Sequence, residues 1–169
     1  MCSSELERLY DAHADSLFAF LLNLTRAESD ARDALQEVFI KLARRPEALQ
    51  GVRDERGFLL RLAHHAAIDL IRRCDVRRRA HEALAAEPTT LFAVATNPDE
   101  AAFRAELADA LGELPPDQRA VVHLKLWEGL TFERIADTLE IPMNTAASRY
   151  RYGLDKLRAR LRPLYEAIR

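Results

Sequence analysis

The chain is poor in cysteine and glycine, and it lacks the patterns typical of β-structure. Cys2 and Cys74 are the only cysteines among 169 residues, so a disulfide framework is excluded and free thiols in a reducing compartment are expected. Only five glycines are present, and no segment alternates apolar and polar residues as a half-buried strand does. Alanine, leucine, glutamate and arginine dominate instead. We therefore predict an all-α protein.

Several classes of function lack their usual sequence signals. No apolar run is long enough to cross a bilayer, and the first residues show no signal-peptide pattern, so we expect a cytoplasmic protein without membrane insertion. No nucleophile elbow, phosphate loop or carboxylate pair is present, so we expect no enzymatic activity. His64 and His65 are adjacent and point about 100° apart on a helix, so no metal site or other cofactor is expected.

Charge is unevenly distributed along the chain, although the formal net charge is only −2. The segment 72–79 has five arginines and one aspartate, and the segment 144–162 has five arginines, one lysine and one aspartate. Between them, the segment 81–110 has six acidic residues and one arginine. Two basic segments predict two contacts with nucleic acid, and the weak overall charge indicates that a partner is needed to hold DNA.

The last third of the chain has the pattern of a helix-turn-helix, a unit that places one helix in the major groove of DNA. Thr131 can cap a helix that buries Ile135, and Pro142 forces a break. Asn144 or Thr145 is then expected to cap a long basic helix. Its buried stripe recurs at three- and four-residue steps and consists of Ala146, Tyr150, Leu154, Leu157 and Leu161.

Two small helical domains are predicted. The first, residues 1–80, has helices over 4–25, from 29 into the forties, and from 58 into the seventies, with a loop at 46–57. A linker at 81–98 contains two prolines and little periodicity. The second domain, residues 99–169, begins with a helix over 99–113 and continues into the helix-turn-helix.

These segments resemble sigma factors of bacterial RNA polymerase, in particular the compact extracytoplasmic-function (ECF) type. Residues 33–42 (DALQEVFIKL) and 58–73 (FLLRLAHHAAIDLIRR) resemble sigma region 2, and residues 111–161 resemble sigma region 4. Both motifs occur in order and at the family's spacing. The resemblance implies a subunit that binds core polymerase and directs transcription initiation at promoters with −10 and −35 elements.

The resemblance also implies residue roles in region 2. One exposed face would bind the clamp helices of the polymerase β′ subunit through Asp33, Gln36, Glu37 and Ile40. A second surface would bind the displaced strand of the −10 element, where the family flips one base into a loop pocket. Its residues would be Arg53, Arg56, Arg61, His65, Asp69, Arg72 and Arg73.

In region 4, the resemblance implies contacts with the −35 duplex. The candidate residues are Arg119, as a phosphate contact, and Thr131, Asn144, Thr145, Ser148, Arg149, Arg151 and Tyr152. The chain departs from the family pattern at Phe58, where tryptophan is common, at His65, where asparagine is common, and at Ala147, where a basic residue is common. The resemblance further implies contact with the polymerase β subunit and control by an anti-sigma factor.

Two other classes of protein fit parts of the sequence. A sigma-like interaction protein would sequester an anti-sigma factor without reading DNA, and Ala147 and the acidic pI favour it slightly. The arginine cluster at 72–79, with Arg149 and Arg151, argues against it. A stand-alone helix-turn-helix repressor would leave the motifs of the first domain unexplained.

Overall fold

A computed structural model describes residues 3–80 and 98–168, and it is all-helical there, which confirms the predicted fold class. The chain divides into two compact units, residues 1–88 and 89–169. The division falls inside the predicted linker, most of which (81–97) lies outside the described residues. The side chains of residues 76–80 also lie outside the description, so three arginines of the 72–79 cluster are not placed.

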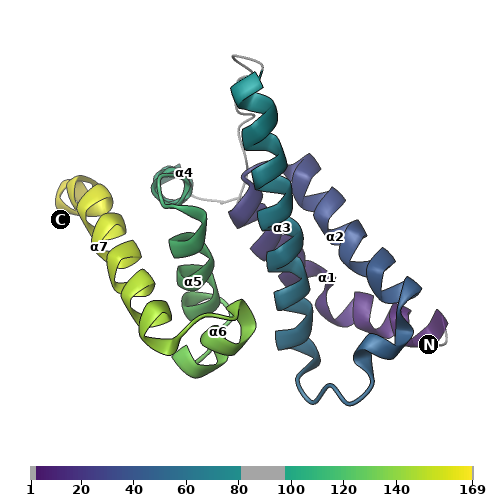
Figure 1. Cartoon of the computed structure of the whole chain (residues 1–169). Helices are drawn as coiled ribbons and strands as arrows, with labels where there is room; N and C mark the ends of the chain where they lie inside the picture. The colour runs from purple at the N-terminus through teal and green to yellow at the C-terminus, as the bar shows by residue number, and fades with distance from the viewer. Residues whose placement is uncertain (1–2, 81–97, 169) are drawn as a thin grey trace. The chain divides into compact units, whose positions relative to one another are not determined.

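The first unit packs three helices against one another: α1 (Ser3–Thr25), α2 (Glu28–Arg44) and α3 (Glu55–Ala80) (Figure 1). A short 3₁₀ helix, η1 (Pro46–Leu49), follows α2. Every pair of these α-helices is in contact, so the apolar stripe of each is covered by the other two. Large side chains with less than 2% exposure fill the centre: Leu9, Leu17, Phe20, Leu21, Leu24, Leu42, Leu59 and Leu60.

Helix α3 begins at Glu55, three residues earlier than the sequence predicts. Asp54 caps it, because the Asp54 carboxylate accepts a hydrogen bond from the Gly57 amide at 3.0 Å. A Cβ at Gly57 would lie 2.5 Å from Asp54 Oδ2, so glycine makes room for this cap. The prediction that 46–57 is entirely loop was therefore wrong, since Gly57 is a helical residue rather than a turn residue.

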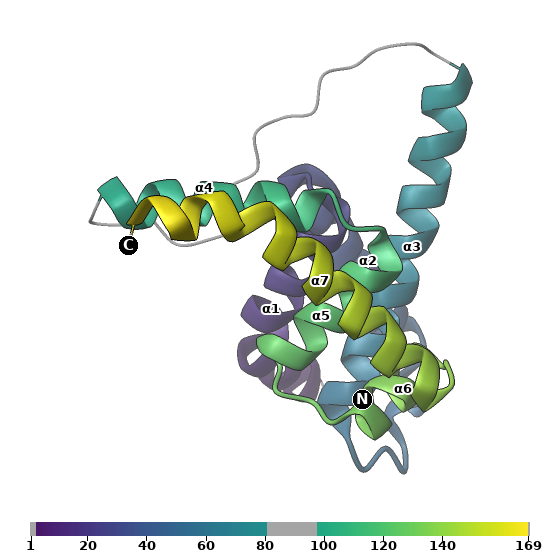
Figure 2. The ribbon, with the colours of Figure 1, turned by 90° about the vertical axis from the view of Figure 1, so that its left-hand side faces the viewer.

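The second unit contains α4 (Pro98–Gly112), α5 (Pro116–Leu126), α6 (Phe132–Leu139) and α7 (Met143–Ile168). Figure 2 shows α4 alongside the C-terminal part of α7, and α5 also packs on α7. The core between them contains Ala110, Leu111, Leu114, Val122 and Leu157. The predicted stripe of α7 is confirmed, because Ala146 and Leu157 are buried and the other members pack partly buried against this unit.

Helices α6 and α7 form the predicted helix-turn-helix. Thr131 caps α6 as predicted, because its hydroxyl accepts a hydrogen bond from the Arg134 amide at 3.3 Å. Glu140 ends α6 in the left-handed region, at φ 55°, and turns the chain toward α7. The predicted cap at Asn144 or Thr145 was wrong, because the Pro142 carbonyl accepts from the amides of Thr145 and Ala146 and starts the helix earlier.

Candidate functional site

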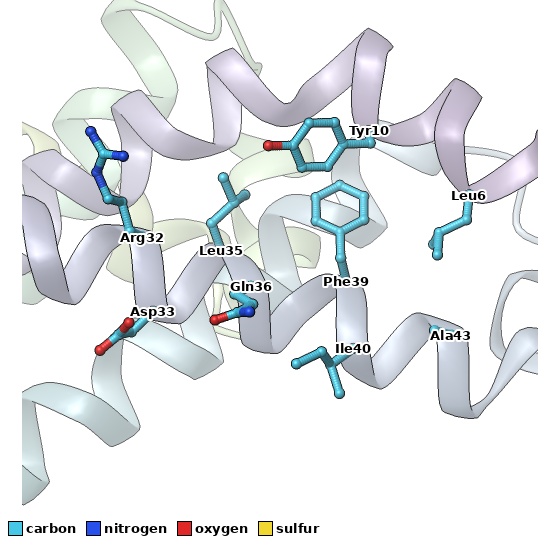
Figure 3. A pocket seen from close by; sticks show the side chains of 9 residues that line it. All are labelled: Leu6, Tyr10, Arg32, Asp33, Leu35, Gln36, Phe39, Ile40 and Ala43. Carbon is cyan, nitrogen blue, oxygen red and sulfur yellow. The ribbon is translucent and has the colours of Figure 1, made fainter. Parts of the chain in front are cut away.

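Three of the four predicted polymerase-binding residues line one hollow on the first unit. Asp33, Gln36 and Ile40 stand in a row along α2, and all three are exposed (Figure 3). The hollow measures about 460 Å³ and lies between α1 and α2. Its other lining residues are Leu6, Tyr10, Arg32, Leu35, Phe39 and Ala43. It combines polar groups at one end with apolar groups at the other.

The apolar end of this hollow is built around an aromatic pair. Tyr10 of α1 and Phe39 of α2 meet edge to face, with ring centroids 5.0 Å apart. Tyr10 is 50% exposed and Ile40 is 40% exposed, which is unusual for large apolar side chains on one small surface. The residues that the sequence assigned to the polymerase surface all lie in α2, so Tyr10 of α1 was missed.

Glu37, the fourth predicted residue, does not line the hollow. Its carboxylate lies 2.8 Å from Lys41 Nζ and 3.7 Å from Arg73 Nη2 of α3. The hydrogen bond from Lys41 holds the pKa of Glu37 below its usual value, and the charge of Arg73 adds to this effect. Glu37 therefore joins the predicted polymerase surface on α2 to a predicted DNA-contacting residue on α3.

The predicted −10 residues follow one face of α3. Arg61, His65, Asp69 and Arg72 recur at three- and four-residue steps, and the last three are exposed. Arg73 lies beside this face, and its Nε donates to the Asp69 carbonyl at 3.2 Å. The two remaining candidates, which are also exposed, lie before the face: Arg53 in the loop and Arg56 in the first turn of α3.

Apart from Arg119, the predicted −35 residues lie at the N-cap of α6 and in the first turns of α7. Thr131 and Asn144 are exposed, and Thr145 and Ser148 are half-buried. The Ser148 hydroxyl donates to the Thr145 carbonyl at 3.0 Å, which leaves its oxygen able to accept. The exposed pair at the next turn is Arg151 and Tyr152, where the guanidinium lies 5.1 Å from the ring centroid.

Arg149 is held by the second unit itself. Its Nη2 lies 2.8 Å from Asp117 Oδ2, at the start of α5, and the arginine side chain is 29% exposed. This ion pair ties α7 to α5. Sequence reasoning missed Asp117, because the two residues are distant in sequence and no local pattern joins them.

Arg119 is buried inside the second unit and does not share an exposed surface with the other predicted −35 residues. It is 5% exposed, and its Nη2 donates to the carbonyls of Gly112 at 3.0 Å and Leu114 at 2.7 Å. A buried guanidinium that satisfies two carbonyls joins the end of α4 to α5. We therefore correct the prediction of a phosphate contact: the structure gives Arg119 a structural role.

Residues 3–80 and 98–168 contain no group of three or more histidine, cysteine or acidic side chains placed to hold a metal ion. Within the same ranges, no helix is both long and apolar enough to span a membrane.

Each of the two units matches a known protein family model. Sigma-70 region 2 matches residues 9–78, and sigma-70 region 4 matches residues 110–159. The ECF RNA polymerase sigma factor SigL of Mycobacterium tuberculosis is 30% identical over 163 residues, which cover 94% of this chain and 90% of SigL. The ECF sigma factor SigX of Bacillus subtilis is 28% identical, over 95% of this chain and 85% of SigX.

A third relative is longer than this chain. The ECF sigma factor SigE of Mycolicibacterium smegmatis is 33% identical over 156 residues, which cover 90% of this chain and 60% of SigE. Among solved structures, the sigma factor RpoE of Bartonella quintana, crystallised with the anti-sigma factor NepR, has a TM-score of 0.71 at 19% identity. The match covers 94% of this chain and 95% of RpoE, and it shows the fold.

Fold and surfaces together define a helical protein with a DNA-binding helix-turn-helix unit. With both sigma regions present in order, the chain belongs to the sigma-70 family of RNA polymerase sigma factors, as a member of the ECF type.

Proposed function

We propose that this chain recruits core RNA polymerase and directs it to promoters by recognising a −10 and a −35 element. The observation that carries the proposal is the helix-turn-helix of α6 and α7. Its first turns present short polar groups and an exposed arginine on the side away from the core. Groups of this kind suit base edges and phosphates in a major groove.

In the first unit, the hollow between α1 and α2 would bind the clamp helices of the β′ subunit. A helix of the partner can place apolar side chains against Ile40 and Tyr10 and a basic side chain near Asp33. The exposed face of α3 would bind the displaced −10 strand, with His65 at the position where base preference is set. The chain itself would perform no chemistry, because the polymerase core synthesises RNA.

In the second unit, Arg151 and Tyr152 are proposed as direct contacts with the −35 duplex, together with Thr131, Asn144, Thr145 and Ser148. Arg149 is proposed to act mainly by position, since Asp117 already holds its guanidinium. The residue at 147 is alanine, so the basic side chains of this surface come from neighbouring positions.

Replacing both Arg149 and Arg151 by alanine is expected to weaken initiation that depends on the −35 element by about tenfold or more, since one good base contact is worth roughly 1–3 kcal/mol. Binding to core polymerase through the hollow of the first unit is expected to stay unchanged, because Arg149 and Arg151 lie in the second unit. In vitro transcription on promoters with and without the −35 element measures the first effect, and core affinity measures the second.

The single variants distinguish the role of Arg149 from that of Arg151. We expect Arg151→Ala to lower duplex affinity without changing thermal stability, because Arg151 is exposed. We expect Arg149→Ala and Asp117→Asn to destabilise the second unit by similar amounts, because each breaks the same ion pair. Normal initiation by the double arginine variant would show that α7 is not the recognition helix.

Further partners follow from the family. RpoE of Bartonella quintana was crystallised with an anti-sigma factor, and we propose that an anti-sigma factor also controls this chain. We further propose contact of the second unit with the polymerase β subunit. Because a protein that acts on chromosomal promoters must be where the chromosome is, we expect the chain in the cytoplasm.

A further inference from the structure

The first turns of α7 carry two apolar side chains to which the proposed function assigns no role. Met143, the first residue of the helix, is 46% exposed. Ala147, one turn further on, is half-buried. Because residues four apart share a helical face, Met143, Ala147 and Arg151 form one stripe. The stripe is apolar at its first two positions and basic at the third.

The direction of this stripe is fixed by the packing of α7. Ala146 is fully buried, and Tyr150 meets Phe132 of α6 edge to face, with ring centroids 5.5 Å apart. Helix α7 cannot rotate about its axis without losing these contacts. Met143 and Ala147 directly precede Asn144 and Ser148 in the sequence, so they border the surface that is proposed to contact the −35 duplex.

This end of the helix presents no charge. Residues 143–148 read MNTAAS, without an acidic or basic side chain. The next residue, Arg149, has its guanidinium 2.8 Å from Asp117, so exposed positive charge on α7 begins at Arg151. Arginine and lysine select guanine in the major groove, because they donate to its O6 and N7. Residues 143–148 contain no cation that could make this contact.

Apolar groups recognise a different feature of the major groove. Thymine presents its C5-methyl group there, and alanine is one of the side chains that contact it. The flexible thioether chain of methionine adapts to irregular apolar surfaces of this kind. The amide of Asn144, beside Met143, suits N6 and N7 of adenine, the base that pairs with thymine. The first turns of α7 therefore favour A·T pairs.

We propose that Met143 and Ala147 determine specificity at the −35 element by covering the C5-methyl groups of two thymines. The proposal rests on the proposed function and names the chemistry that this helix recognises. The two residues lie about 6 Å apart along the helix axis, four residues at 1.5 Å each. The two thymines are therefore expected within about two base-pair steps of each other, at 3.4 Å per step.

Replacement of thymine by uracil tests this contact, because uracil keeps every base-pairing group of thymine and lacks only the C5-methyl group. The test uses holoenzyme, formed from the full chain and core polymerase, and a duplex with the −35 element that the wild-type start sites define. Uracil at either of two positions is expected to weaken wild-type binding about threefold, as the loss of one covered methyl group does. Met143→Ala should abolish the response at one position, and Ala147→Gly should abolish it at the other.

Matched variants separate a lost contact from lost stability. Ala159→Gly makes the same substitution at an exposed position further along α7. Leu126→Ala shortens an apolar side chain that is 51% exposed at the end of α5. Both variants should keep the wild-type response to uracil. The ratio of the affinities for thymine and uracil does not depend on the folded fraction of a variant, so it reports the contact alone.

A converse measurement adds the methyl group back. A C·G pair at either position should bind more weakly than the T·A pair, and 5-methylcytosine in place of cytosine should restore about threefold in affinity. Met143→Ala and Ala147→Gly should each fail to respond at their own position.

Equal wild-type affinity for thymine and uracil throughout the −35 element would overturn the proposal, as would an element without two such thymines. Loss of the uracil response in the control variants would overturn it too. In these cases a scrambled −35 element still binds weakly, so the proposed function stands. If scrambled and native elements bind equally well, the proposed function fails and the proposal fails with it.

Discussion

Ile40→Glu is expected to lower the affinity of the chain for core polymerase by about 30-fold or more, with folding unchanged. Ile40 is 40% exposed at the apolar end of the hollow that also holds Tyr10 and Asp33. A partner helix that covers this end would bury the new carboxylate among apolar side chains without a partner. Truncation of central apolar anchors typically costs about 2 kcal/mol or more at protein interfaces.

The matched control is Ala19→Glu, which adds the same charge at an exposed position of α1 that does not line the hollow. It should bind core polymerase normally. Native gel shift or biolayer interferometry with core polymerase measures both affinities, and thermal unfolding checks that both variants fold. Equal affinity of Ile40→Glu and the wild type would place the polymerase-binding surface elsewhere on the chain.

Gly153→Leu is expected to destabilise the second unit by about 3 kcal/mol and to abolish binding to the −35 duplex. Gly153 is buried where α7 crosses α5, and a Cβ there would lie 2.7 Å from Val122 Cγ2. Val122 is fully buried, so it has little room to move. Overpacking of this kind typically costs about 1–3 kcal/mol, and leucine adds more atoms than alanine would.

Hydrogen exchange measured by mass spectrometry can follow the two units separately in this variant. Protection should fall in α5, α6 and α7 and stay unchanged in α1, α2 and α3, because the clash lies within the second unit. The control Ala159→Leu adds a leucine at an exposed position of α7. In addition, Val122→Ala, when combined with Gly153→Ala, should restore part of the stability that Gly153→Ala removes. The second substitution deletes Cγ2 of Val122, the atom that the new Cβ would meet. Wild-type protection in Gly153→Leu would contradict this packing.

Local patterns predicted the helices and the helix-turn-helix. The stripe of α7 and the cap at Thr131 are properties of residues three or four positions apart, so the sequence displays them directly. The row of Asp33, Gln36 and Ile40 on one exposed face of α2 is predictable for the same reason. These features depend on helical periodicity and on little else.

The features that the sequence could not predict depend on contacts between elements. Periodicity does not show that Arg119 is buried against two carbonyls, because the end of α4 supplies them. Nor does it show that Asp117 holds Arg149, or that Glu37 lies near Arg73. Gly57 misled the assignment of α3, because glycine usually marks a loop and here accommodates a capping aspartate.

The most direct test of the central claim is reconstituted transcription with this chain and bacterial core polymerase on fragmented genomic DNA from its host. Sequencing of the RNA 5′ ends identifies the start sites. The account predicts discrete start sites that share two upstream motifs, at the spacing of a −10 and a −35 element, and that disappear when the chain is omitted. Binding to core polymerase without any defined start site would contradict it and would favour a sigma-like protein that does not read DNA.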